Sequence, residues 1–206
     1  FRAMLVAADR RTREGRRDYA LLLTFLNTGA RVQELLDLRP IDLQLERPLQ
    51  IRLYGKGRKE RFCPLWSQTA ESLREVVNER EFGIDSTEPI FRNRRGEPLT
   101  RFGVRHILRT YAQRAQIAVP SLARKRVHPH IMRHTAAVHL LQAGVDLVSI
   151  SHWLGHASVE TTNRYAVVDL ETKRKAVASA GPLSEASPPI AAWRSDASVL
   201  EWLETL

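Results

Sequence analysis

The amino-acid sequence predicts a mainly helical domain with one small antiparallel β-sheet, an α+β fold. Apolar residues recur at helical spacing in several separate stretches, and two short runs with strand character flank a turn that contains two glycines. The chain has 206 residues, of which 43% are hydrophobic and 27% are charged, as in an ordinary soluble globular protein. This length suits one good core, or one domain with an appendage, and no apolar run is long enough to span a bilayer.

The first predicted helices lie before Pro40. Residues 1–8 look like the end of a helix, which suggests that the sequence begins inside a longer protein. Residues 20–26 are apolar nearly all round and predict a buried helix, which stops where Gly29 follows. A second helix is expected over residues 31–38, because the proline that comes next cannot continue it.

A β-hairpin is expected next. Residues 49–54 and 59–65 have strand character and flank a Gly-Lys-Gly-Arg turn, in which Lys56 lies at the tip and Arg58 follows. The turn is not a phosphate-binding Walker loop, because that loop needs Ser or Thr and a helix after its lysine. Helical periodicity then resumes over residues 66–80.

Three polar residues of this first half have simple local interpretations. Arg31 falls in the first turn of its predicted helix, where pairing with Glu34 on a solvated face accounts for it. A solvated turn position likewise accounts for Lys56 when it is taken alone. Cys63 is the lone cysteine, which excludes an intramolecular disulfide, and its apolar neighbours predict a small buried residue in a reducing cytoplasm.

Basic residues gather in the middle of the chain. Residues 89–99 predict a short strand and a basic turn, and residues 101–115 predict a helix capped by Thr100. Arginines recur every four residues along that helix, which suits either a surface that follows a phosphate backbone or a plain solvated face. The net charge of +9 makes polyanions the natural partners, nucleic acid before a membrane surface. The candidate DNA contacts are Arg58, Arg94, Arg95, Arg101 and Arg105.

The densest chemistry lies between residues 128 and 165. Apolar spacing after Pro129 predicts a helix that ends at a glycine. His130 lies at its start and Arg133 three residues on, so one helical turn brings both to the same edge, where the guanidinium can reach an oxyanion beside the imidazole. A short capped helix follows, and the glycine before His156 permits a tight turn that can direct this histidine back toward the pair. A further helix is expected to carry Tyr165.

Together these segments resemble the catalytic domain of the tyrosine recombinase (phage integrase) family. Five separated segments agree with it in order and spacing: residues 28–36, 55–61, 130–135, 154–156 and 161–165. The resemblance implies the fold of that domain, double-stranded DNA as partner, and Glu34 as a supporting acidic residue. It also implies an arginine pair, a hairpin lysine, two histidines and a nucleophilic tyrosine, which here are Arg31, Arg133, Lys56, His130, His156 and Tyr165.

The implied reaction is DNA strand cleavage and rejoining through a phosphotyrosyl link. Two arginines present planar donor forks that match the non-bridging oxygens of a phosphodiester under attack. A phenol has a pKa of about 10, so Tyr165 needs cationic surroundings and a nearby acceptor such as His130 to lose its proton. Lys56 suits the role of general acid for the leaving oxygen, and His156 that of a hydrogen-bond donor to the phosphate. Neither a cofactor nor a metal is required.

A zinc site is the rival interpretation of the histidines. His130 and His134 are four residues apart on a helix, but the glutamate of a His-Glu-x-x-His site is absent and Arg133 would repel a cation. His134, with His139, is instead interpreted as a core or supporting histidine. Trp153 is interpreted as core packing that sets the Leu-Gly-His turn.

The expected domain boundaries place the catalytic domain at residues 1–179 and a linker with an amphipathic tail helix at residues 180–206. After Tyr165 the chain departs from the commonest family pattern, in which a polar residue and a histidine follow. The resemblance implies that such a tail docks on a neighbouring subunit of a tetramer on DNA, while docking on its own domain stays equally open. The resemblance also implies an amino-terminal core-binding domain in relatives, which we do not expect within this chain.

Two functional interpretations follow. The first is a site-specific recombinase of the integrase or transposition type, and the second is an inactive DNA-binding or assembly module of the same fold. The presence of all six residue types favours the enzyme. No secretory leader precedes the first helix, so a cytoplasmic location without a membrane partner is expected.

Overall fold

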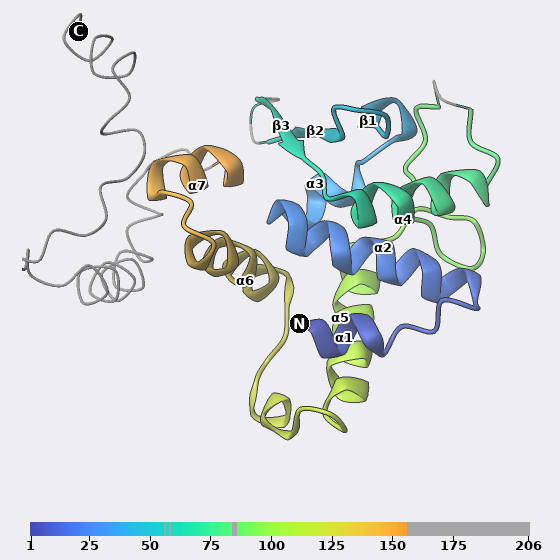
Figure 1. Ribbon diagram of the computed structural model, residues 1–206. Coiled ribbons are helices and arrows are strands. Elements are labelled where there is room, and N and C mark those ends of the chain that lie inside the picture. Colours follow the sequence, from blue (N-terminus) through green and yellow to red (C-terminus); the bar gives the residue numbers. More distant parts are fainter. Residues whose placement is uncertain (56, 58, 84–85, 156–206) are drawn as a thin grey trace, which may run out of the picture. The chain divides into compact units, whose positions relative to one another are not determined.

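The computed structural model describes residues 1–55, 57, 59–83 and 86–155, which all belong to the first of two compact units of the chain (Figure 1). Its α-helices are α1 (Arg2–Val6), α2 (Arg13–Thr28), α3 (Val32–Leu36), α4 (Ser67–Asn78), α5 (Arg101–Ala115), α6 (Pro129–Gln142) and α7 (Leu147–Leu154). Short 3-10 helices span η1 (Pro40–Asp42) and η3 (Pro120–Arg124), and the strands are β1 (Leu43–Gln44), β2 (Gln50–Tyr54) and β3 (Glu60–Pro64). The prediction of a mainly helical fold with a small antiparallel sheet is confirmed.

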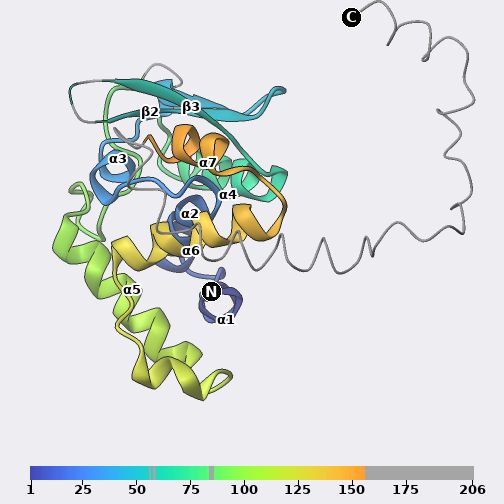
Figure 2. The same cartoon turned by 90° about the vertical axis from the view of Figure 1, so that its left-hand side faces the viewer.

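Helix α2 is the centre of the unit, with α4 and α6 packed against it (Figures 1 and 2). It begins at Thr12, whose side-chain oxygen accepts a hydrogen bond from the backbone N–H of Gly15 at 3.0 Å. It ends at Gly29, which adopts a left-handed conformation (φ 57°) that L side chains rarely tolerate. Residues 20–25 are all buried, so this stretch of α2 is enclosed nearly all round, as predicted.

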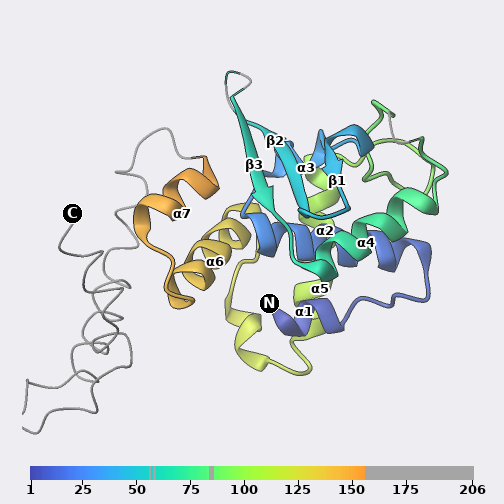
Figure 3. The ribbon, with the colours of Figure 1, turned by 45° about the horizontal axis from the view of Figure 1, so that its top comes forward.

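The three strands form an antiparallel sheet in the order β1-β2-β3 (Figure 3). The register pairs Ile51 with Cys63 and Arg52 with Phe62. Because side chains alternate between the two faces of a strand, Ile51, Leu53 and Cys63 are buried while Phe62 is exposed. The predicted hairpin strands and the buried cysteine are confirmed.

Helices α6 and α7 enclose a second, smaller core of Ala137, Leu141, Ile150 and Leu154. Helix α7 begins where the side chain of Asp146 accepts the N–H groups of residues 148 and 149 at 3.0 and 2.9 Å. It also contacts β3, whereas α6 packs against α2, so α7 lies next to the hairpin and α6 lies beside α2 (Figure 2).

A buried polar link joins α2 to α5. Arg17 donates two hydrogen bonds to Asp18 Oδ1 (2.8 and 2.6 Å), and the hydroxyl of Tyr111 donates to Asp18 Oδ2 (3.1 Å). Burial raises the pKa of the Asp18 carboxyl above its usual value, with Arg17 acting in the opposite direction. Burial and the neighbouring Asp18 charge raise the pKa of Tyr111 to about 12.

The helix predicted over residues 31–38 is shorter than expected. It starts at Val32 and ends before Asp37, and Arg39 is already extended (φ −120°, ψ 158°) because Pro40 disfavours helical conformation at the residue before it. Within the part of the chain that the structure describes, no helix combines the length and apolar character needed to cross a bilayer.

Candidate active site

Arg31 begins helix α3, and its guanidinium lies beside the buried carboxylate of Glu34. Its backbone is extended (φ −70°, ψ 150°), so Arg31 caps the helix. The prediction that it lies in the first turn is wrong. Its N–H donates to Glu34 Oε2 (2.7 Å), its Nη1 to Glu34 Oε1 (2.9 Å) and its Nη2 to the carbonyl oxygen of Gly155 (3.1 Å). The predicted pairing with Glu34 is confirmed, but the face is not solvated: the Arg31 side chain is 40% exposed and the Glu34 side chain only 3%.

A second arginine, Arg61 on β3, holds the same carboxylate. It donates to both oxygens of Glu34, at 2.9 and 2.6 Å, in the forked geometry that suits a guanidinium and a carboxylate. Burial alone would raise the pKa of the Glu34 carboxyl, but the hydrogen bonds and charges of Arg61 and Arg31 outweigh it and hold this pKa below its usual value. Glu34 is therefore a fixed negative charge between two fixed positive ones.

Arg133 lies on the buried side of α6 and bridges the ends of two other helices. It is 8% exposed, and it donates from Nη1 to the carbonyl oxygen of Gly29 (2.7 Å) and from Nη2 to that of Leu154 (2.6 Å). Gly155 ends α7 in a left-handed conformation (φ 64°), as Gly29 ends α2, so both turns present their carbonyls toward this guanidinium. The tight turn predicted at Gly155 is confirmed.

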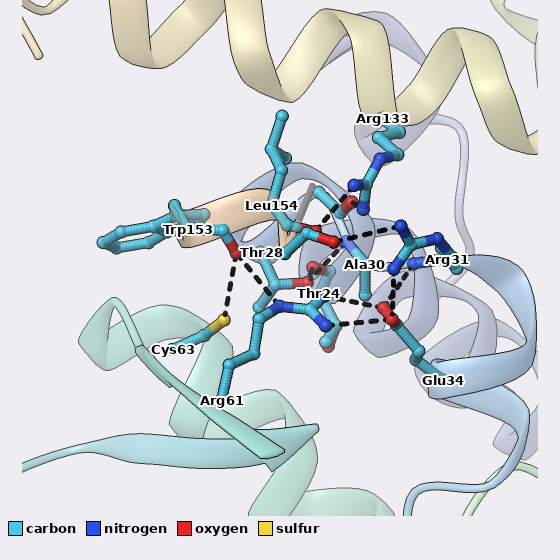
Figure 4. Close-up of polar contacts among 12 residues, drawn as sticks. Thr24, Thr28, Ala30, Arg31, Glu34, Arg61, Cys63, Arg133, Trp153 and Leu154 are labelled. Carbon is cyan, nitrogen blue, oxygen red and sulfur yellow. Dashed lines mark hydrogen bonds and ion pairs between the residues drawn. The ribbon is translucent and has the colours of Figure 1, made fainter. Parts of the chain in front are cut away.

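Three guanidiniums thus converge on the carboxyl end of α7 (Figure 4). They donate to three successive carbonyl oxygens: Arg61 to Trp153 at 3.0 Å, Arg133 to Leu154 at 2.6 Å and Arg31 to Gly155 at 3.1 Å. These carbonyls have no partner within the helix, and cations at a helix carboxyl end also complement its dipole. The cluster gathers three permanent positive charges against the one carboxylate of Glu34, directly before residue 156 in the chain.

A basic groove of about 770 Å³ runs beside α5 and the segment that leads into α6. Arg101, Arg105 and Arg109 are exposed and line it, so the prediction that they share one helix face is confirmed. Arg101 also donates to the Gln33 side chain at 2.8 Å, which ties this end of the groove to α3. Lys125 and Arg126 complete its cationic lining, and His106, His128 and His130 also border it.

The histidines of α6 lie on its solvent side. His130 is exposed in the groove, and its ring meets that of His128 edge-on at a centroid distance of 6.2 Å. Of the two alternatives given for His134 and His139, a core position is wrong, since both are exposed, while a supporting role stays a prediction. Met132, Arg133, Ala136, Ala137 and Leu141 turn toward the interior at helical spacing, which leaves positions 134 and 139 outside.

Several predicted site residues lie outside the part of the chain that the structure describes. These are Lys56, Arg58, His156, Tyr165 and the tail over residues 180–206. Trp153 is described: it packs in part against the core of α6 and α7, as predicted. Among the described residues, His, Cys, Asp and Glu side chains nowhere gather in threes as a metal site requires.

Arg94 and Arg95 lie far from the arginine cluster at the carboxyl end of α7. Both are exposed in a turn that lines a separate basic pocket together with Arg13, from the first turn of α2. Gly29 ends the same helix, and 16 residues at a rise of 1.5 Å put roughly 24 Å between these ends. These two arginines therefore belong to a different surface from Arg31.

Arg61 is the site residue that the sequence analysis did not single out. A signal was present, because residues two apart on a strand face the same side, and Arg61 stands two before the buried Cys63. An arginine on the inward face of a strand needs a buried partner, and Glu34 is that partner.

With this geometry in view, the chain belongs to the phage integrase family, which it matches over residues 2–171. It is 42% identical over 204 residues to a putative integrase/recombinase, y4rC, of Sinorhizobium fredii, covering 99% of this chain and 60% of that protein. It is 37% identical over 175 residues to the tyrosine recombinase XerC of Bacillus subtilis, covering 82% of this chain and 55% of the relative. The chain therefore spans little more than half the length of these relatives.

Solved structures give the same fold. The crystal structure of XerA recombinase superimposes with a TM-score of 0.72 at 28% identity, covering 89% of this chain and 63% of that one. The structure of the XerH site-specific recombinase, bound to its palindromic difH substrate, superimposes with a TM-score of 0.71 at 28% identity, covering 85% of this chain and 50% of that one. The catalytic domain of bacteriophage HP1 integrase, at 21% identity and a TM-score of 0.57, supports the fold alone, with 91% of this chain and 94% of that domain covered. The predicted tyrosine recombinase catalytic-domain fold is confirmed.

Proposed function

We propose that this chain is the catalytic part of a site-specific DNA recombinase that cuts and rejoins strands through a 3′-phosphotyrosyl link to Tyr165. The observation that carries the proposal is the meeting of Arg31 and Arg133 at the carboxyl end of α7. One comes from the α3 cap and the other from α6, and both donate to the turn that directly precedes His156. Membership of the phage integrase family supports the same conclusion.

Arg31 and Arg133 are proposed to clamp the phosphate. Negative charge spreads over the non-bridging oxygens as the phosphorus is attacked, and guanidiniums held in place by surrounding hydrogen bonds stabilise it without reorganising. Arg31 is anchored by Glu34 and still 40% exposed, so it faces both the protein and an incoming ligand.

The proposed bond changes balance without a cofactor or a metal. The Tyr165 oxygen forms a bond to phosphorus as its proton passes to an acceptor, for which exposed His130 is suited. The bond from phosphorus to the 5′ oxygen breaks, and Lys56 supplies the proton that this oxygen needs. His156 donates a hydrogen bond to the phosphate. The phosphotyrosyl link keeps the energy of the broken ester, so a 5′ hydroxyl of another strand can reverse the step and reseal the DNA.

Double-stranded DNA is the proposed partner, and the groove beside α5 is its proposed docking surface. Arg101 and Arg105 stand exposed in that groove, on a helix tied to α3 through Gln33. Guanidiniums along a helix face neutralise successive phosphates and release counterions, which makes the affinity for DNA depend on salt concentration. Arg94 and Arg95 are proposed to meet a more distant phosphate.

The remaining proposals concern the organisation of the whole protein. Residues 1–179 are proposed as the catalytic domain, and the tail over residues 180–206 as a contact between subunits of a tetramer on DNA. The relatives that the chain matches are longer, and a full recombinase is expected to use their additional length to clamp DNA. The chain by itself is therefore expected to bind DNA weakly.

A nicked suicide duplex tests the proposal. Such a substrate loses a short fragment after cleavage, so the covalent protein–DNA product accumulates and separates on a denaturing gel. Trapping is expected for the unaltered chain, absent for Tyr165→Phe and unchanged by EDTA. Binding without any trapped product favours the inactive DNA-binding module instead, and loss of product in EDTA refutes the metal-free mechanism.

A further inference from the structure

Arg61 connects three elements that each carry or precede a proposed catalytic residue. It stands on β3, after the hairpin turn that contains Lys56. It donates to both oxygens of Glu34 on α3, the helix capped by Arg31, and from Nε to the carbonyl oxygen of Trp153 on α7 at 3.0 Å (Figure 4). Helix α7 in turn precedes His156 in the chain.

The side chain of Arg61 is fixed by its surroundings. It is 11% exposed, and Nε, Nη1 and Nη2 all donate to protein oxygens. Gly155 approaches it closely: a side-chain carbon added to that glycine would lie 3.1–3.4 Å from the guanidinium group of Arg61. A rigid, desolvated contact of this kind sets the relative position of β3, α3 and α7 far more tightly than a solvated ion pair.

Arg61 also determines how much of Arg31 is left for a phosphate. Glu34 is nearly buried and needs partners for both of its oxygens. With Arg61 present, the Arg31 guanidinium contributes only Nη1 to Glu34. Without Arg61, the carboxylate would draw the Arg31 fork into a bidentate pair, turning it away from Gly155 and from any ligand.

From these contacts we infer that Arg61 is a positioning residue for strand cleavage. It holds Glu34 so that Arg31 keeps donors for the phosphate, and it fixes the carboxyl end of α7, to which Arg133 also donates. This inference rests on the proposed function. A shift of about 1 Å in such a group is enough to lower a rate about 100-fold.

The chain contains a matched control for this arrangement. Asp42, whose side chain is 1% exposed, lies between Arg39 (2.8 Å) and the strand residue Arg52 (3.2 Å). As in the site, the first arginine caps a helix three residues before the carboxylate, and the second comes from the sheet. The partners of Arg52 are Asp42 and the ring of Tyr54, neither of which belongs to α7. Arg52→Gln therefore removes the same kind of ion pair away from the site.

The test measures the rate of covalent trapping on a nicked suicide duplex, and the Kd for the same DNA, with the full chain and its variants. Arg61→Gln is expected to trap about 100-fold more slowly, by the misplacement estimate above, with Kd changed less than about threefold. Arg61→Lys keeps the charge but loses the forked donor geometry, so its trapping rate is expected to lie between those of Arg61→Gln and the unaltered chain. Arg52→Gln is expected to trap within about threefold of the unaltered rate, although it also breaks a buried pair.

Chemical rescue provides a readout that a purely structural role would not move. In Arg61→Ala, added guanidinium chloride at concentrations far below the denaturing range is expected to restore trapping, while the same concentrations of sodium chloride do not. The inference is overturned if Arg61→Gln and Arg52→Gln slow trapping equally. It is also overturned if Arg61→Gln weakens DNA binding, measured as Kd, without slowing trapping. Failure of the unaltered chain to trap DNA refutes the proposed function itself, so the two failures are distinguishable. If Arg61→Gln does not fold, Arg61→Lys decides by the same comparison.

Discussion

Replacing Gly29 with alanine tests the packing that brings α7 onto the carboxyl end of α2. A side-chain carbon built at this position lies inside van der Waals contact with Leu154 Cδ2 and 3.3 Å from the Ala136 side chain. The backbone angle φ of 57° adds a second cost, because a left-handed residue with a side chain is less stable by about 1–2 kcal/mol. Overpacking of a formed core adds about 1–3 kcal/mol. The expected loss of unfolding free energy is therefore roughly 2–5 kcal/mol.

Gly144→Ala separates the two costs. Gly144 also has a positive φ (88°), but a side-chain carbon there meets no atom within 4 Å. The Gly144→Ala variant is therefore expected to lose only about 1–2 kcal/mol of unfolding free energy, from the backbone conformation alone. Urea unfolding of the full chain, followed by the fluorescence of its tryptophans, gives both values, since the free energy falls linearly with denaturant. Equal losses in the two variants would refute the close approach of Leu154 to Gly29 and, with it, the geometry that gives Arg133 its two carbonyl partners.

Three further predictions concern charge. Tyr111→Phe removes a phenol whose pKa is raised from 10 to about 12. The stability that the protonated hydroxyl contributes is therefore complete below pH 10 and is lost as the pH rises toward 12. The unfolding free energies of the two proteins should converge over that range, and a constant difference between them contradicts this prediction. Glu34→Gln is expected to cost roughly 3 kcal/mol near pH 7, because it leaves buried guanidinium charge unpaired. Since the pKa of Glu34 is held below 4.5, this cost should be constant above that pH and shrink as the pH falls through the lowered value, and a cost that does not change in acid would refute the assignment. Removing Arg101 and Arg105 together as glutamines should reduce the slope of log Kd for duplex DNA against log salt by about 1.8, or 0.9 for each lost phosphate contact, whereas Arg114→Gln, on the same helix but outside the groove, should leave the slope unchanged.

The sequence by itself determined the class of fold and most element ends. Thr12, Thr100 and Asp146 cap helices through their own side chains, and Gly29 and Gly155 end helices in left-handed conformations. These are local effects, in which the residue type and its immediate neighbours decide the backbone conformation. Alternation along the hairpin strands is likewise a local effect and accounts for the burial of Ile51, Leu53 and Cys63. The order of polar segments along the chain was enough to indicate the family.

Only the tertiary structure decided how the site is held. Arg31 and Gly155 stand 124 positions apart, and Arg133 and Gly29 stand 104 apart. The acceptors in these contacts are backbone carbonyls, which every residue possesses, so no residue type marks the ones that a guanidinium will reach. The burial of Glu34 and its ion pair with Arg61 follow from the packing of the hairpin against α3 and α7. Side-chain chemistry can be read along a chain, but the choice among identical carbonyl groups is made only when distant segments meet.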